Sequence, residues 1–135
     1  MADITITAAN IGCGSNALVR RVTGGEAIAH GQPVYQQSNG KFYKADSNNS
    51  EQTAEAQGIS FCSCSGDTVD FFILFFGKMK FGAILTKGET YCVSDAAGGI
   101  CPIGDVGSGE WVTILGVASD TSTLDVDIKA TRIQK

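Results

Sequence analysis

The sequence predicts an all-β protein, either a compact β-sandwich or a barrel-like domain, with an internal pseudo-repeat and little helix. Three observations predict this fold. Residues 25–61 and residues 82–119 share a pattern of glycines and apolar residues. Short runs of β-branched and aromatic residues recur along the chain, and several alternate apolar and polar residues with a period of two. Many of the 17 glycines fall at the ends of these runs, where turns require them.

The two related units match at defined positions. Gly31 of the first unit corresponds to Gly88 of the second, and Val34 corresponds to Tyr91. Each unit continues through a turn rich in Asn, Asp and Gly into a matching strand. A single supersecondary element of this kind cannot bury its own apolar face. We therefore expect both units to pack together in one domain, the usual organisation for a chain of 135 residues.

The division that follows is an N-terminal arm or strand, residues 1–10, and a single β domain, residues 11–135, that contains both units (about 25–61 and 82–119). Helix is limited to one turn near residues 53–57. The expected strands cover residues 3–8, 17–22, 33–35, 57–60, 69–76, 90–93, 110–116 and 124–130, with one more short strand between the turns at 98–99 and 104–109.

The N-terminal run alternates apolar and polar residues, which is typical of a half-buried strand. It lies before the first unit, so we expect the fold to need it least. Such a strand either closes an edge of the protein's own sheet or adds to the sheet of a partner. As a partner-binding segment it comprises Asp3, Ile4, Thr5, Ile6, Thr7 and Ala8.

The most apolar stretch of the chain is a six-residue run, which predicts a strand buried on both faces. One face would meet the protein's own core, and the other would meet another subunit. Leaving either face in water would be costly, since burying each large apolar side chain contributes roughly 1.5–3 kcal/mol. The candidate oligomer interface is therefore Phe71, Phe72, Ile73, Leu74, Phe75 and Phe76.

Composition argues against several classes of partner. The formal net charge is −4, and the ten basic residues are scattered, with Arg20–Arg21 as one of few close pairs. Nucleic-acid binding requires a clustered basic face, so we expect none. The longest apolar run is far shorter than the roughly 20 residues that span a bilayer, so we expect no membrane role.

No set of residues predicts catalysis, and we expect neither an enzyme nor a cofactor or metal. The five cysteines are an odd number, which favours free thiols that pack as small apolar side chains. Asp125 and Asp127 share one face of a predicted strand, but a calcium site would also need an oxygen-rich, glycine-turned loop. The alternative from another class is a cysteine-dependent hydrolase, in which His30, the only histidine, would approach one of the cysteines.

Several stretches resemble the small capsid cement, or decoration, proteins of tailed bacteriophages. The resemblance covers the chain from about Gly24 to the C-terminus. It is carried by Gly25–Ile28, Gly31–Tyr35, Ser38–Asp46, Gly58–Ile59, Tyr91–Asp95, Gly98–Ile100 and Trp111–Ala118.

The resemblance implies a structural protein that is made in the host cytoplasm and binds the outer surface of a phage capsid. It also implies a homotrimer that braces subunits of the major capsid protein against internal pressure. Another structural role in the same particle, as a tail or head-fibre component, is the alternative within this class. The contact with the shell is expected to lie in the N-terminal strand, and the contact between subunits in the run of phenylalanines.

Overall fold

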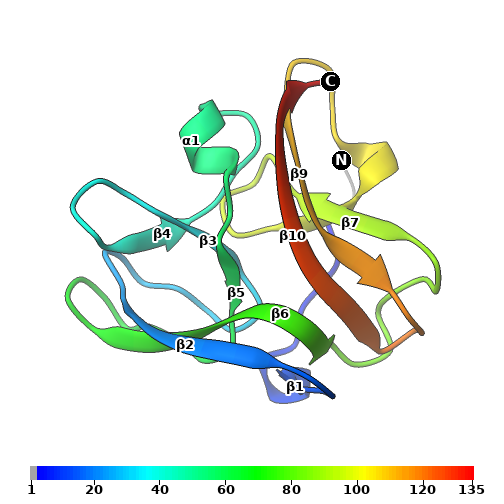
Figure 1. Ribbon diagram of the computed structural model, residues 1–135, viewed down its shortest axis with the longest axis horizontal. Coiled ribbons are helices and arrows are strands. Elements are labelled where there is room, and N and C mark those ends of the chain that lie inside the picture. The colour runs from blue at the N-terminus through cyan, green and yellow to red at the C-terminus, as the bar shows by residue number, and fades with distance from the viewer. Residues whose placement is uncertain (1–2) are drawn as a thin grey trace.

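The computed structural model describes residues 3–135. In this part of the chain, ten strands form one curled antiparallel sheet, and the only α-helix is a single short turn (Figure 1). The predicted all-β fold class is confirmed. The elements are η1 (Ala8–Asn10), β1 (Gly12–Cys13), β2 (Leu18–Thr23), β3 (Pro33–Gln36), β4 (Phe42–Lys44), α1 (Glu51–Ala54), β5 (Gly58–Ser60), β6 (Asp70–Lys80), β7 (Thr90–Val93), β8 (Ile100–Pro102), η2 (Ile103–Asp105), β9 (Trp111–Ala118) and β10 (Thr123–Gln134).

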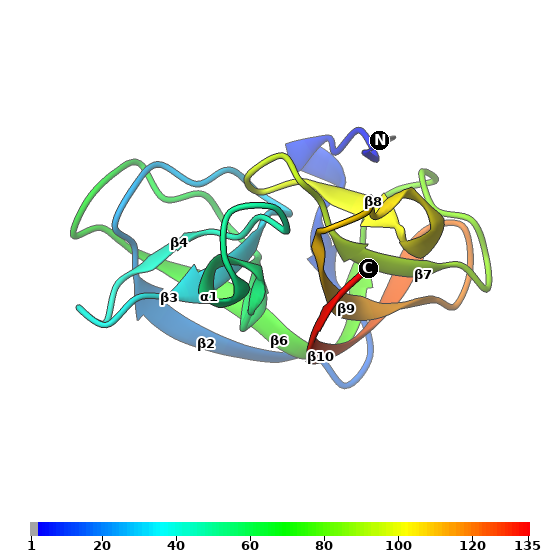
Figure 2. The same cartoon turned by 90° about the horizontal axis from the view of Figure 1, so that it is seen from above.

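The sheet is built from two units with the same order of strands. The first unit has the order β4-β3-β5-β6, and the second has the order β8-β7-β9-β10. In the first unit β2 pairs with the first half of β6, and in the second unit the other half of β6 pairs with β10. Strand β6 is therefore the last strand of one unit and the first strand of the next. The two units lie side by side as two lobes (Figure 2).

The register of the strands is also repeated. Val34 of β3 lies opposite Gly58 of β5, and Tyr91 of β7 lies opposite Gly116 of β9. Both glycines are sites of close approach: a Cβ on Gly58 would lie 2.8 Å from a methyl carbon of Ile73, and one on Gly116 would meet the backbone of β10. The glycines that match in sequence thus occupy the same place in each unit.

The corner that precedes each unit's central strand is repeated as well. Gly31 and Gly88 both have positive φ, 74° and 84°, a conformation that glycine adopts without steric cost. The Gly31 N–H donates to the carbonyl of Ser60 at 2.8 Å, and the Gly88 N–H donates to the carbonyl of Ala118 at the same distance. One hydrogen bond in each unit therefore ties the corner to the end of the third strand.

The apolar core is divided between the units at β6. Phe71 and Ile73 pack into a cluster inside the first unit, with Val34 and Phe42. Leu74 packs into a larger cluster that fills the second unit and the junction between the two. A register shift between β2 and β6, which leaves Phe75 without a partner on β2, accompanies this change. Because successive side chains of a strand point to opposite faces, one strand contributes to two cores.

The loop that carries α1 belongs to the first unit and makes hydrogen bonds to β9 of the second unit. The predicted helical turn forms slightly earlier than expected, because Ser50 caps it: the Ser50 side chain accepts from the Thr53 N–H at 3.2 Å. The Thr113 hydroxyl of β9 donates to the carbonyl of Ala54, and the Trp111 N–H donates to the carbonyl of Ser47 at 2.8 Å. These two hydrogen bonds connect the polar loop of the first lobe to β9 of the second lobe.

The N-terminal segment forms no strand in the protein's own sheet, so that alternative is wrong, whereas addition to a partner's sheet stays a prediction. Residues 3–7 form no strand, and η1 follows them. One backbone bond, from the Ile4 N–H to the carbonyl of Ile100 at 2.9 Å, attaches the segment to β8, while Ile4 and Ile6 pack on the larger core cluster. The segment is extended and half-buried without joining a ladder. Alternation of apolar residues occurs in such a segment for the same reason as in a strand.

Candidate interaction surface

The structure divides the run of residues 71–76 into buried and exposed positions. Phe71, Ile73 and Leu74 are buried in the protein's own core, and Phe75 is partly buried. Phe72 and Phe76 remain 45% and 46% exposed. A partner subunit could therefore cover only part of the predicted interface.

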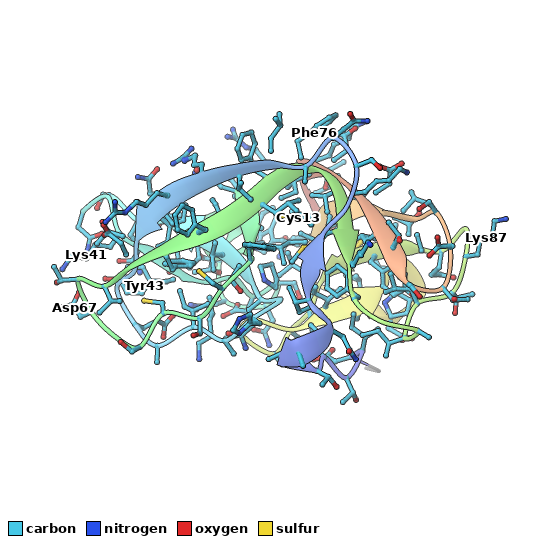
Figure 3. The ribbon with its side chains drawn as sticks, turned by 90° about the horizontal axis from the view of Figure 1, so that it is seen from below. Cys13, Lys41, Tyr43, Asp67, Phe76 and Lys87 are labelled. Carbon is cyan, nitrogen blue, oxygen red and sulfur yellow. The ribbon has the colours of Figure 1, made fainter. Side chains whose placement is uncertain are left out.

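Strand β2 adds two further exposed apolar side chains beside these phenylalanines. Leu18 is 50% exposed and lies directly opposite Phe76 in the register, while Val19 is 44% exposed and lies opposite Leu74, two residues from Phe72. We call Leu18, Val19, Phe72 and Phe76 the β2–β6 apolar surface. Phe76 lies on the outside of the molecule, near where β6 passes from one lobe to the other (Figure 3).

Three pairs of oppositely charged side chains lie next to this surface. Arg21, which lies opposite Phe72, contacts Asp70 at 2.9 Å. On the side of Phe76, Lys78 contacts Asp125 at 3.5 Å, and Lys129 contacts Asp127 at 3.9 Å. Exposed pairs of this kind contribute little to stability, but they cancel the local charge. A chain with a net charge of −4 thus has a nearly neutral surface here, which favours contact with another apolar surface.

A shallow groove continues the surface from Phe76 onto β9 and β10. Its volume is about 320 Å³, and Val117, which is 43% exposed, lies in it together with Asp125 and Asp127. Each of these aspartates has a lysine partner on the same sheet. No group of three or more His, Cys, Asp or Glu side chains in residues 3–135 could hold a metal ion. The groove thus extends the exposed apolar area from Phe76 to Val117.

The residues of the predicted capsid-binding segment divide between the core and the surface. Ile4 and Ile6 face the core, whereas Thr5, Thr7 and Ala8 are exposed. The Ser94 hydroxyl donates to Asp3 at 2.5 Å, which fixes the start of the segment. The side chains that this segment exposes to a partner include those of Thr5, Thr7 and Ala8.

The surroundings of His30 and of two buried thiols bear on the alternative of a cysteine hydrolase. His30 lines a pocket of about 280 Å³ beside the N-terminal segment, and no cysteine is among the described residues that line it. Cys92 and Cys101 are buried, and burial raises the pKa of Cys92 to about 11 and that of Cys101 to about 12. A nucleophilic cysteine requires a lowered pKa. Cys92 and Cys101 are therefore poor nucleophiles in the folded protein.

These pKa values predict a graded reactivity of the thiols. With the native protein at pH 8 and iodoacetamide, we expect Cys13, which is exposed, to react first, and Cys92 and Cys101 to react slowest. All five cysteines should react after unfolding. Folding raises the pKa of these two thiols from 9.0 to about 11 and about 12. The folded protein therefore keeps its full free energy of unfolding below pH 9 and loses part of it as the pH rises toward 11 and 12. Mass spectrometry of timed samples measures the order, and rapid labelling of Cys92 would contradict it.

Sequence reasoning did not identify Leu18 and Val19 as surface residues. They begin a strand that was predicted correctly, but no local pattern distinguishes an edge strand with exposed apolar side chains from a buried one. The missing information is that β2 pairs on one side only, with β6.

The comparisons with known proteins do not identify a family. No protein-family model matches the chain, and no curated protein has a significant sequence match to it. In residues 3–135 there is no helix with the length and apolar character needed to cross a membrane.

Proposed function

We propose that this protein is a structural virion protein that binds the outer surface of a phage capsid and stabilises the shell. The sequence resemblance to capsid decoration proteins suggests the role, and the β2–β6 apolar surface is the observation that supports it most directly. Four large apolar side chains, each 44–50% exposed and set among paired charges, are suited to burial against another protein. The partners in this proposal are further copies of the chain, as a homotrimer, and the major capsid protein.

The architecture suits a bracing role. The two units share β6 and are clamped by the loop that carries α1, so contacts made on one lobe are held in a fixed position relative to the other. In a trimer, three modest contacts with the shell would act together through a high effective concentration. The exposed face of the N-terminal segment, with Thr5 and Thr7, is the proposed shell contact.

Binding to shells tests this proposal directly. Purified protein is mixed with expanded capsids that lack it, sedimented with them, and located by electron microscopy through a tag at the C-terminus. Saturable binding with density on the outer surface is expected. Density on a tail or head fibre would favour the alternative structural role, and failure to bind any part of the particle would overturn the proposal.

A further inference from the structure

The outer edge of β2 carries backbone groups that no described strand uses. The Phe72 N–H donates to Cys62 Sγ at 3.2 Å, and the Phe72 carbonyl accepts from the Phe61 N–H at 2.9 Å, both on the side away from β2. Paired residues in an antiparallel ladder direct their backbone groups the same way relative to each other, either both inward or both outward. Arg21, the partner of Phe72, therefore directs its N–H and C=O away from β6, and by alternation Val19 does the same.

The second unit fills the corresponding edge with an additional strand. There, β1 pairs with β6 through Gly12 opposite Lys80 and Cys13 opposite Met79. The ladder continues beyond β1, because the Gly14 N–H donates to the Lys78 carbonyl at 2.7 Å. In the first unit β2 lies next to β6, and in the second unit the second half of β6 lies next to β10 in the same way. The second half of β6 is then followed by β1, whereas no described strand follows β2. The repeat therefore marks the outer edge of β2 as a position that accepts a strand.

The side chains on this edge define the kind of strand that fits. The Arg20 guanidinium lies 5.5 Å from the centre of the Phe42 ring, which holds it in place, and it has no acidic partner within residues 3–135. Arg21 is already neutralised by Asp70. A carboxylate opposite Arg20 would form a charge-assisted hydrogen bond. The residues before and after that carboxylate would lie on the other face of the added strand, beside exposed Val19.

We propose that the outer edge of β2 accepts an extended segment of a partner protein by β-augmentation, with an acidic residue opposite Arg20 and apolar residues on either side of it. Backbone hydrogen bonds supply affinity in such a complex, and alternate side chains supply selectivity. A second copy of β2 is a poor occupant. Antiparallel pairing about the middle of the strand that keeps these backbone directions sets either Arg20 opposite Arg20 or Arg21 opposite Arg21, and like charges directly opposite are destabilising.

Model peptides test the proposal on the full-length protein. The probes are acetyl-Thr-Thr-Val-Glu-Val-Thr-Thr-amide and the same peptide with Lys in place of Glu, titrated into isotope-labelled protein and followed by NMR. We expect the acidic peptide to shift the amide signals of residues 17–24 and to bind roughly tenfold more tightly than the basic one, the usual size of one charge-assisted contact. Arg20→Glu should reverse this preference. Lys87→Glu makes the same change of charge at the far end of the molecule (Figure 3) and should leave it unchanged.

Three results would overturn the proposal. The first is a titration in which the acidic peptide shifts no amide in residues 17–24. The second is an Arg20→Glu protein that keeps its folded spectrum but still prefers the acidic peptide; Arg20→Gln, which should abolish the preference without reversing it, guards against a local effect of the new charge. The third is a change in sedimentation mass on Arg20→Glu, which would make a second copy of the chain the occupant.

Discussion

Replacing Gly77 with alanine is expected to lower the free energy of unfolding by about 3–5 kcal/mol, a large share of the 5–15 kcal/mol that stabilises a typical domain. Gly77 has φ of +99° in the middle of β6, and a non-glycine residue held there costs roughly 1–3 kcal/mol. A Cβ at this position would also lie 2.6 Å from the carbonyl carbon of Asn16 and 2.7 Å from the Cα of Ala17. Overpacking of this kind costs roughly 1–3 kcal/mol more, because the contact is with backbone that cannot rotate away.

Two other glycines separate the causes. Gly88→Ala meets no atom within 4 Å but keeps a positive φ of 84°, so it measures backbone strain alone. Gly104→Ala has neither strain nor a close neighbour and should be nearly neutral. In urea unfolding, the loss of unfolding free energy should be largest for Gly77→Ala, smaller for Gly88→Ala and smallest for Gly104→Ala. If Gly77→Ala costs no more than Gly88→Ala, the close packing of the segment before β2 against β6 is not as described.

The repeat could be predicted from the sequence because its main requirements are local. Gly31 and Gly88 stand at corners with positive φ, and Gly58 and Gly116 stand where a neighbouring strand approaches closely. Each of these positions requires a glycine at a fixed number of residues from the next apolar run, and this spacing can be read from the sequence alone. Strand pairing across the repeat follows from the same spacings.

The sharing of β6 between the two units could not be predicted. The continuous apolar run at residues 71–76 indicates burial on both faces, but it does not reveal that Ile73 belongs to one core and its neighbour Leu74 to another. That division depends on which strands, distant in sequence, pack on each face of β6. For the same reason the sequence could not separate Phe72 and Phe76, which remain exposed, from the rest of the run.

The N-terminal segment illustrates a different limit. Its period-two pattern correctly separates Ile4 and Ile6 from the exposed residues between and after them, yet the segment has one backbone bond to β8 and no ladder. Burial on one side imposes alternation on any extended chain. Whether the neighbouring backbone groups are free to pair is set by the rest of the fold, which the local pattern does not report.

Phe76→Asp is expected to abolish self-association of the protein while leaving its fold intact. Phe76 and its partner Leu18 are about half exposed in the single chain, so the substitution removes little from the monomer's own core. In a trimer that buries this surface, the new carboxylate would lose its water without gaining a partner, since Asp127 already lies opposite. We expect the dissociation constant of the trimer to rise at least a hundredfold, which corresponds to a loss of about 2.8 kcal/mol in the free energy of association.

Matched variants distinguish this surface from the core and from exposed apolar residues in general. Phe72→Asp should behave like Phe76→Asp, whereas Phe71→Asp should unfold the protein, because Phe71 is only 1% exposed. Ile133→Asp changes a side chain that is 63% exposed near the end of β10, away from the β2–β6 apolar surface, and should have no effect on association. Sedimentation equilibrium gives the mass of each variant, and circular dichroism reports its folding. A wild-type protein that sediments as a monomer, or a Phe76→Asp variant that remains a trimer, would show that the proposed subunit contact does not involve this surface.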